Sequence, residues 1–197
     1  MRIPACIVLG VALISTFAAC EQESDSLVVA NATDVSTLDP YAMFSRHEVS
    51  FADHVIQTLT FLDKEMDIVP WLATEWRRLE DSLTWEFRLR EGVQFHNGEP
   101  FEAEAVKFSI DLVYQRNAEG KTLGGATVAV PSAEITHVDV VDAHTVRITT
   151  ANPKALLPFY LTQLPIVSPG FYAHASDAER AVHMVGTGPY VISARVR

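Results

Sequence analysis

Cysteine is scarce in this chain, which has only two in 197 residues, Cys6 and Cys20. Cys6 lies inside an apolar N-terminal run that we expect to be removed, so the mature chain would keep Cys20 alone. A single cysteine excludes an intramolecular disulfide, even in an oxidising compartment. We therefore expect the fold to depend on its hydrophobic core.

Basic residues are also in short supply. Lysine and arginine total 15 against 25 aspartate and glutamate residues, which gives a formal net charge of -10. Arg2 is the only charged residue in 1–19, so removing that segment leaves 14 basic against 25 acidic side chains. An acidic surface is repelled by phosphate backbones and anionic lipid headgroups. We expect no nucleic acid partner, and no membrane contact through surface charge.

The composition does not have the excess of glycine and proline that is typical of disordered chains. Apolar residues make up 48% of the chain, beside 9 glycines and 10 prolines. That apolar content is enough to build a core, and the length suits one or two compact domains. The chain is therefore expected to be folded and globular.

Familiar catalytic motifs are missing too, since neither Gly-x-Ser-x-Gly nor His-Glu-x-x-His occurs. His47, Glu48, Asp53 and His54 place four potential metal ligands within eight residues. His47 and His54 lie two helical turns apart, which is too far to hold one small ion without further ligands. We predict no enzyme activity, no metal site and no cofactor.

The first 19 residues are typical of an export signal. Arg2 is followed by an apolar run from Ile3 to Leu13 and by small residues before Cys20. A membrane span is the alternative, but the acidic, serine-rich residues that follow favour cleavage and a tether over residues 20–26. Small residues directly before a cysteine resemble the bacterial lipobox, although Phe17 stands where leucine is usual. We predict that Cys20 carries lipid and anchors the protein to a membrane; a freely released protein is the alternative.

The clearest structural signal lies in residues 83–112. From Leu83 to Arg90 apolar and polar residues alternate, which is the period of a strand with one buried face. Gly92 and Gly98 mark two turns. After Pro100 the apolar residues take a helical period. The pattern predicts an amphipathic helix whose apolar stripe consists of Phe101, Ala105, Phe108 and Leu112.

Two capping boxes predict further helices, because a serine is followed three residues later by a glutamate at Ser45 and at Ser176. The helix that follows Ser45 is expected to reach about Leu62, with a turn over residues 63–65, and the one that follows Ser176 to reach about Met184.

Other segments give weaker signals. Strands are expected over 27–30, 134–141 and 145–150, the last two as a hairpin, and a loop over 120–131. Asn152-Pro153 predicts the start of a helix that Pro158 must kink or end. A glycine-rich bend at 186–190 should enter a strand that begins near Tyr190, and its Pro189 and lack of lysine argue against a phosphate loop.

Several short motifs occur in the order seen in one protein family. They are Ser36-Thr37-Leu38-Asp39-Pro40-Tyr41, Ala73-Thr74-Glu75-Trp76, Leu89-Arg90-Glu91-Gly92-Val93-Gln94-Phe95-His96-Asn97-Gly98, Val141-Asp142-Ala143-His144-Thr145-Val146 and Gly186-Thr187-Gly188-Pro189-Tyr190. The chain thereby resembles the extracytoplasmic solute-binding proteins of family 5, which serve ABC importers of peptides, nickel and opines. The motifs cover nearly all of the chain after residue 27.

The resemblance implies a mixed α/β (α+β) fold. It would be the first lobe of a two-lobed periplasmic-binding-protein fold of type II, similar to cluster C, and incomplete. Residues 27–197 would form the N-terminal part of the solute-binding domain, with main-lobe pieces near 27–45 and 186–197 and a smaller subdomain between them. Family members are well over twice this long, so we expect an N-terminal fragment without the second lobe.

The resemblance also implies a ligand surface, because in the family the loop after the Leu-Asp-Pro motif lines the cleft between lobes. The matching residues are Tyr41, Met43, Phe44, Ser45 and Arg46. Trp71 is a further candidate, since first-lobe aromatics sometimes line that cavity, although a place in the core suits all three tryptophans. Arg46 could pair a ligand carboxylate or lie in solvent. His96, a lone histidine beside a turn, is expected to be a structural hydrogen-bonding residue.

The predicted function is that of the substrate-binding component of an ABC importer. It would capture oligopeptides or similar small solutes in the periplasm, or at the outer face of the cell membrane, and deliver them to a permease. Two alternatives stay open: a lipoprotein sensor or scaffold that presents a ligand to a receptor, and a fragment with no activity of its own. A neighbouring permease gene would favour import, and a receptor kinase gene would favour sensing.

Overall fold

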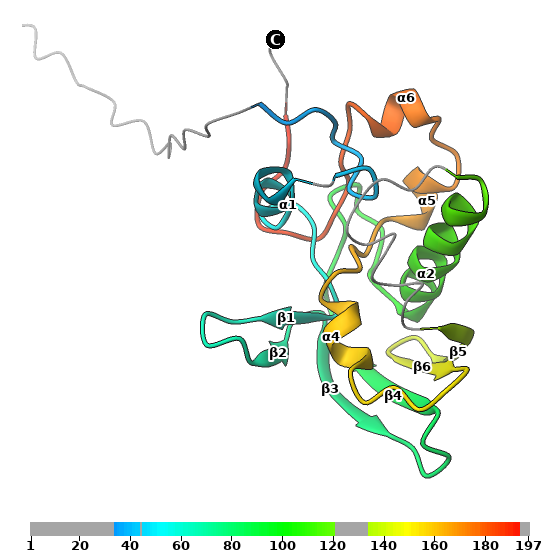
Figure 1. Ribbon diagram of the computed structural model, residues 1–197. Helices are drawn as coiled ribbons and strands as arrows, with labels where there is room; N and C mark the ends of the chain where they lie inside the picture. The colour runs from blue at the N-terminus through cyan, green and yellow to red at the C-terminus, as the bar shows by residue number, and fades with distance from the viewer. Residues whose placement is uncertain (1–33, 44, 121–133, 194–197) are drawn as a thin grey trace, which may run out of the picture. The chain divides into compact units, whose positions relative to one another are not determined.

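The computed structural model describes residues 34–43, 45–120 and 134–193 (Figure 1). The predicted export signal, the tether, the lipidation site Cys20 and the strand over 27–30 lie outside these residues. So do Phe44 and nearly all of the expected loop over 120–131.

Four strands form an antiparallel sheet in the order β3-β4-β6-β5. They are β3 (Ala73–Arg78), β4 (Thr84–Leu89), β5 (Ile135–Asp142) and β6 (Thr145–Thr150). The alternating pattern after Leu83 is confirmed in the second half of β4, where Phe87 and Leu89 are buried and Arg88 between them is exposed; in the first half Thr84 is buried and Trp85 is only half-buried. The predicted hairpin is also confirmed, with Val140 opposite Val146 in the register of β5 and β6.

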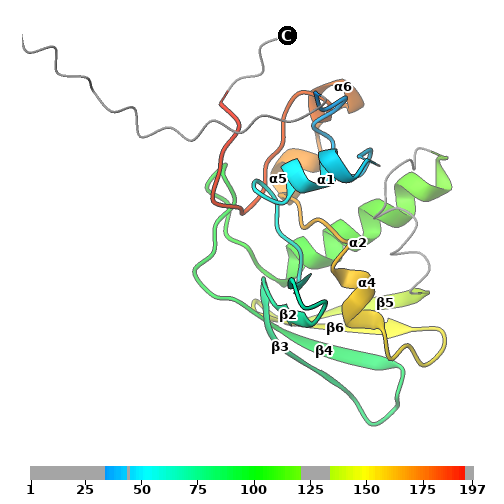
Figure 2. The same ribbon diagram turned by 60° about the vertical axis from the view of Figure 1, so that its left-hand side comes forward.

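The predicted amphipathic helix is present as α2 (Ala103–Ala118). Its expected stripe is only partly right: Ala105 and Leu112 are buried, but Phe108 is half-buried. Large apolar side chains one or two residues further along the chain, Val106, Ile110 and Val113, are buried almost completely. Figure 2 shows α2 lying across one face of the sheet, and over the opposite face the described part of the chain places no helix.

The helix after Ser45 is shorter than predicted, because α1 (Arg46–Ala52) ends ten residues before Leu62. The capping box of Ser45 and Glu48 is confirmed. Beyond the helix the backbone bonds other segments: the carbonyl of Val55 accepts from the amide of Gly188 at 2.9 Å. These tertiary bonds replace the helical ones, and the chain continues as an extended segment.

That segment enters a small hairpin of β1 (Thr60–Leu62) and β2 (Ile68–Pro70). The predicted turn over residues 63–65 lies between its strands, where Asp63 accepts from the amides of Glu65 and Asp67. Figure 1 shows the hairpin projecting beside β3 and α4.

The predicted helix start at Asn152-Pro153 is wrong. The helix α4 (Leu157–Leu161) begins later, and Pro158 lies in its first turn, so it neither kinks nor ends the helix. The side chain of Asn152 donates to Glu134 at 2.9 Å instead of capping a helix. The carbonyl of Lys154 accepts from the indole of Trp85 at 3.1 Å. Both bonds hold residues 152–154 outside the helix.

Two short helices follow, α5 (Pro169–Tyr172) and α6 (Asp177–Arg180). The Ser176 capping box is confirmed, but α6 ends before the expected Met184. Residues 190–193 form no strand. The prediction of a strand beginning near Tyr190 is therefore wrong for the described residues, which end at Ser193. The Tyr190 amide instead donates to the carbonyl of His54 at 3.2 Å. The division into main-lobe pieces and a smaller subdomain stays a prediction.

Candidate functional site

The Leu-Asp-Pro motif is an internal anchor of the loop that precedes α1. Leu38 and Asp39 are buried, and Asp39 accepts from the Tyr41 amide at 3.0 Å. Its other carboxylate oxygen lies 2.9 Å from Nη2 of Arg116 on α2, and both side chains are at least 94% buried. Arg116 also contacts Asp177 of α6 at 3.4 Å. This ion-pair network connects the loop to two helices.

Tyr41 and Met43, two of the predicted ligand residues, lie in the core. Their exposed fractions are 0% and 1%. The Tyr41 hydroxyl donates to the carbonyl of Pro165 at 2.9 Å, and burial raises the pKa of the phenol far above its usual range. In this arrangement neither side chain reaches a surface where a ligand would bind. Their burial does not support direct contact with a ligand.

Ser45 and Glu48 form a polar group at the start of α1. Ser45 donates from its hydroxyl to Glu48 at 2.9 Å, and the amide of Ser36 donates to the other carboxylate oxygen at 2.9 Å. Burial raises the pKa of Glu48, but the hydrogen bonds from Ser36 and Ser45 outweigh it and lower the pKa to about 2. Glu48 is therefore a fixed anion that orients the loop.

Arg46 lies in the first turn of α1 and is exposed. Among the residues that the structure describes, none forms an ion pair with its guanidinium. The side chain is therefore held neither in the core nor in an ion pair. Of the predicted ligand residues that are described, Arg46 is the most accessible.

Trp71 belongs to a second surface, at the base of the β1–β2 hairpin. Its half-buried ring stacks on Phe61 with centroids 4.6 Å apart. With the Gln57 amide oriented to satisfy both neighbours, its oxygen accepts from Trp71 Nε1 at 2.9 Å and its nitrogen donates to Thr187 at 3.0 Å. Among the described contacts, no hydrogen bond or ring contact joins Trp71 to Arg46.

Sequence reasoning missed Gln57 and Phe61 as neighbours of Trp71. Both fell within the helix predicted to reach Leu62, where residues four apart share a face, and no local pattern indicated Trp71 as their neighbour. Thr187 stood in a quoted motif, but nothing in that motif indicated which side chain it would contact.

His96 holds two family motifs together. Its Nε2 donates to the carbonyl of Gly188 at 2.8 Å, and its Nδ1 accepts from the amide of Gly186 at 3.4 Å. Its own amide donates to Gly186 at 2.9 Å. The structural role expected for His96 is confirmed, and so is the bend at residues 186–190.

Two of the four candidate metal ligands near α1, His54 and Glu48, make ordinary hydrogen bonds. His54 bonds the carbonyl of Ser50 through Nδ1 at 2.8 Å, and Glu48 is occupied by the serines. Within residues 34–43, 45–120 and 134–193, no three His, Cys, Asp or Glu side chains are grouped so that they could hold a metal ion. In the same ranges, no helix has the length and apolar character needed to cross a membrane.

Comparison with known proteins places these features in a family. The model of the bacterial extracellular solute-binding proteins, family 5 Middle, matches residues 67–197. The glutathione-binding protein GsiB of Escherichia coli strain 536 is 31% identical over 186 residues, covering 93% of this chain and 35% of that protein. The probable D,D-dipeptide-binding periplasmic protein DdpA of E. coli K12 is 31% identical and covers 86% of this chain and 34% of that protein.

The fold agrees with solved structures of periplasmic binding proteins. The crystal structure of NikA from Brucella suis in complex with Fe(III)-EDTA matches with a TM-score of 0.68 and 27% identity, over 83% of this chain and 32% of that chain. This chain thus has a mixed α/β fold that corresponds to one part of such structures. It spans about a third of the length of the relatives it matches, and it belongs to family 5 of the bacterial extracellular solute-binding proteins.

Proposed function

We propose that this chain supplies one wall of a solute-binding site in the substrate-binding component of an ABC importer. The solute would be an oligopeptide or a similar small molecule, captured outside the cytoplasmic membrane and passed to a permease. Binding would be reversible, with no catalysis and no cofactor. The names of GsiB and DdpA, a glutathione binder and a probable dipeptide binder, support a peptide-like solute.

The observation that carries the proposal is the sequence similarity to these binding proteins over 93% and 86% of the chain. The loop after the Leu-Asp-Pro motif adds local support. It is anchored by Asp39 and Glu48, and it presents the exposed Arg46 at the start of α1. A guanidinium in that position suits a carboxylate of the solute.

Within this wall we assign direct contact to Ser45, Arg46 and Trp71, and to Phe44 from its place in the same loop. Trp71 would offer an aromatic face, and the Trp71–Gln57–Thr187 chain of hydrogen bonds would hold its ring in position. Tyr41 and Met43 would support the loop from beneath. We propose further that Cys20 carries the lipid that keeps the protein at the outer face of the membrane.

A chimera tests this function. This chain would replace the matching first third of GsiB, and binding of short peptides, glutathione included, would be measured by calorimetry. We expect binding, and we expect Arg46→Gln to weaken it about tenfold or more, because a charged hydrogen bond to the solute is lost. Lys107→Gln on α2 removes a similar charge away from the loop and should leave the affinity unchanged. A folded chimera that binds none of these solutes would contradict the proposal.

A further inference from the structure

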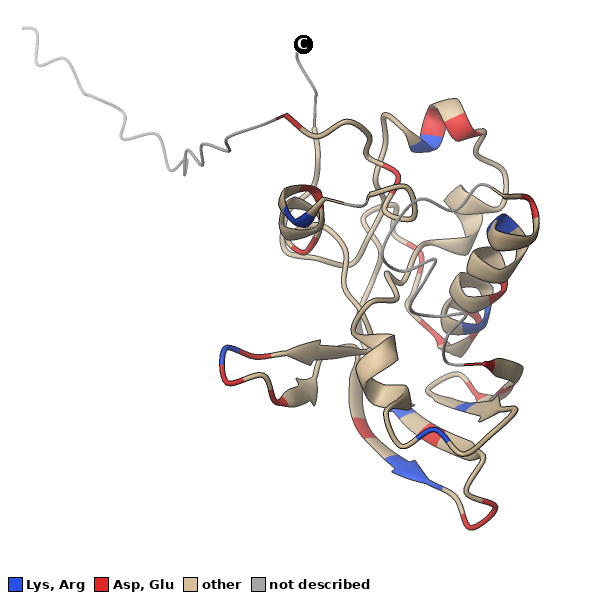
Figure 3. Cartoon of the chain, viewed as in Figure 1, with Lys and Arg blue, Asp and Glu red and all other residues tan. Residues whose placement is uncertain are grey.

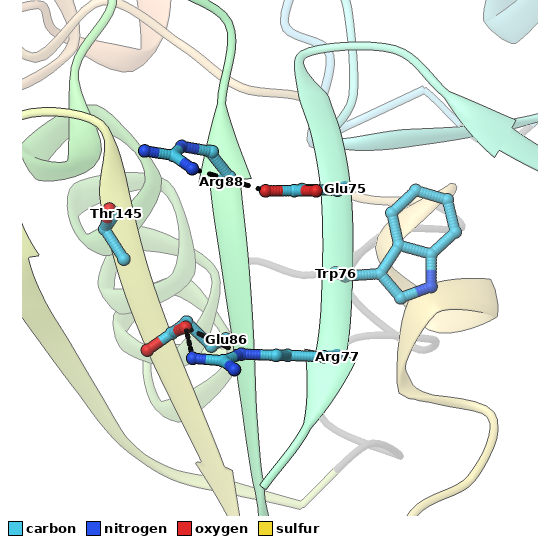
Figure 4. A pocket seen from close by; sticks show the side chains of 6 residues that line it. All are labelled: Glu75, Trp76, Arg77, Glu86, Arg88 and Thr145. Carbon is cyan, nitrogen blue, oxygen red and sulfur yellow. Dashed lines mark hydrogen bonds and ion pairs between the residues drawn. The ribbon is translucent and has the colours of Figure 1, made fainter.

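The sheet face that α2 leaves uncovered carries a row of charged side chains around a shallow pocket. The pocket has a volume of about 430 Å³ and is lined by Glu75, Trp76, Arg77, Glu86, Arg88 and Thr145. Figure 3 shows basic and acidic segments side by side on β3 and β4. In Figure 4 the four charged side chains lie along one side of the strands, and the ring of Trp76 points away from them.

One part of this row is a closed ion-pair group. Arg77 donates to one oxygen of Glu86 at 3.0 and 2.6 Å, and Arg147 donates to the other oxygen at 2.9 Å. The Glu86 side chain is only 15% exposed. These hydrogen bonds lower the pKa of Glu86 and occupy both of its oxygens. Glu86 is thus held by the two arginines and is not open to a ligand.

The second part of the row is open. Glu75 and Arg88 face each other across β3 and β4, but Nη1 of Arg88 lies 3.5 Å from Glu75, at the limit of a hydrogen bond. Their side chains are 68% and 66% exposed. An exposed pair of this geometry contributes little free energy, so a ligand can replace it at little cost.

The balance of charge in the pocket selects the kind of ligand. Two guanidinium groups and two carboxylates line it, so a simple anion would gain one ion pair and be repelled by the nearest carboxylate. A simple cation would gain one ion pair with a carboxylate and be repelled by the nearest guanidinium. A zwitterion can satisfy an opposite charge at each end. Glu75 and Arg88 are register partners on neighbouring strands, and both side chains are long and exposed, so their charged ends can separate to receive the two charges of one amino acid.

We propose that this pocket is a second solute site, which binds a free α-amino acid. The amino acid carboxylate would accept from Arg88 and its ammonium group would donate to Glu75, in place of their mutual contact. The site lies on the sheet and shares no residue with the loop of residues 41–46. It therefore does not depend on the proposed transport function.

Titration of the full chain with L-alanine, followed by NMR shifts of the backbone amides, tests this site. At constant ionic strength we expect saturable shifts at Glu75 and Arg88 in the millimolar range. Propionate and isopropylammonium each carry only one of the two charges and should bind about tenfold more weakly. Arg88→Gln and Glu75→Gln should each weaken alanine binding by a similar factor.

Arg78→Gln is the matched control, because Arg78 is exposed on β3, the strand of Glu75, but does not line the pocket. It should leave the titration unchanged. Equal shifts with all three ligands would mean unspecific charge pairing and would overturn the proposal. So would the absence of saturable shifts at Glu75 and Arg88, or alanine binding that survives both substitutions, in variants shown to be folded by circular dichroism.

Discussion

Two glycines determine how closely the bend at residues 186–190 packs against the rest of the chain. A Cβ placed on Gly186 would lie 2.2 Å from the carbonyl oxygen of Val55, and one on Gly188 would lie 2.6 Å from the Val55 carbonyl carbon. Backbone atoms cannot rotate away as a side chain can. The glycines of this motif are therefore required for close backbone contact and not for binding phosphate.

We predict that Gly186→Ala destabilises the chain by about 1–3 kcal/mol, the range found for overpacked interiors. Urea unfolding would measure the loss. Gly170→Ala is the comparison: the three atoms nearest its Cβ all belong to the Glu99 side chain and none to the backbone. That side chain can move if it gives up its bond to the Gly170 amide, so a smaller loss is expected. Equal losses in the two variants would contradict the argument.

Glu48 makes stability depend on pH. Hydrogen bonds from Ser36 and Ser45 outweigh burial and lower its pKa from 4.5 in the unfolded chain to about 2 in the folded one. A carboxylate whose pKa is lower in the folded state stabilises the protein at pH values above its unfolded-state pKa. This stabilisation is lost as the pH falls toward the folded-state pKa. The free energy of unfolding of the native chain should therefore fall by about 1–3 kcal/mol between pH 4.5 and pH 2. The Glu48→Gln variant should not show this fall.

Chemical unfolding at several pH values would measure this difference. Glu179→Gln provides the comparison, because Glu179 completes the same kind of capping box on the exposed helix α6. It should alter the pH profile much less than Glu48→Gln. If the native chain and Glu48→Gln showed parallel profiles, the proposed role of the carboxylate would be wrong.

At the scale of elements, the ion pair of Asp39 and Arg116 connects the Leu-Asp-Pro loop to α2. Both side chains are buried and their charged atoms are 2.9 Å apart. A buried charge that loses its partner is costly, whereas removal of both charges is often tolerated. This pair should therefore behave as a unit.

We predict that Arg116→Met destabilises the chain by about 3–5 kcal/mol. The double variant Arg116→Met with Asp39→Asn should recover part of that loss, because no unpaired carboxylate remains. A double-mutant cycle from denaturant unfolding gives the coupling free energy. Additive losses would show that the pair is not coupled.

His96 connects the turn after β4 to the bend at residues 186–190. His96→Ala removes two side-chain hydrogen bonds, and we expect a loss of about 1–3 kcal/mol. His137→Ala removes an exposed contact with Asp139 and should cost almost nothing. Thermal unfolding of the two variants would test the difference; an equal effect would mean that His96 has no special structural role.

Elements were predictable where a local pattern decided them. β4 and α2 follow from their hydrophobic periods, and α1 begins at its capping serine. The end of α1 was not predictable, because the carbonyl of Val55 bonds Gly188, a partner 133 residues along the chain. The late start of α4 has the same cause, since Asn152 and Lys154 bond Glu134 and Trp85. Local patterns contain no information about such distant partners.

At the scale of the whole molecule, the chain corresponds to about a third of its relatives' length. Large apolar side chains are exposed near its end, with Val182, Tyr190 and Val191 showing 49%, 55% and 64% of their surface. Val182 and Val191 line one pocket, and neighbouring exposed apolar residues are typical of surfaces that pack against another polypeptide. The single wall of a binding site proposed above would also offer a ligand few contacts.

We therefore predict that the 197-residue chain alone binds no solute tightly. Isothermal calorimetry against a peptide library would measure this, and a single ligand with submicromolar affinity would contradict it. Weak binding of free amino acids at the sheet would not contradict it, because the dissociation constant of that site is expected to be millimolar.

The sequence by itself determined the family, three strands of the main sheet, the long helix and the starts of α1 and α6, because short motifs, hydrophobic periods and capping residues act locally. It also identified the loop after Pro40 as a candidate ligand surface. Only the tertiary structure decided which residues of that loop are accessible: Tyr41 and Met43 are in the core, and Arg46 is in solvent. Which side of a loop faces the core depends on contacts with distant segments such as Pro165, and those contacts exist only after the chain has folded.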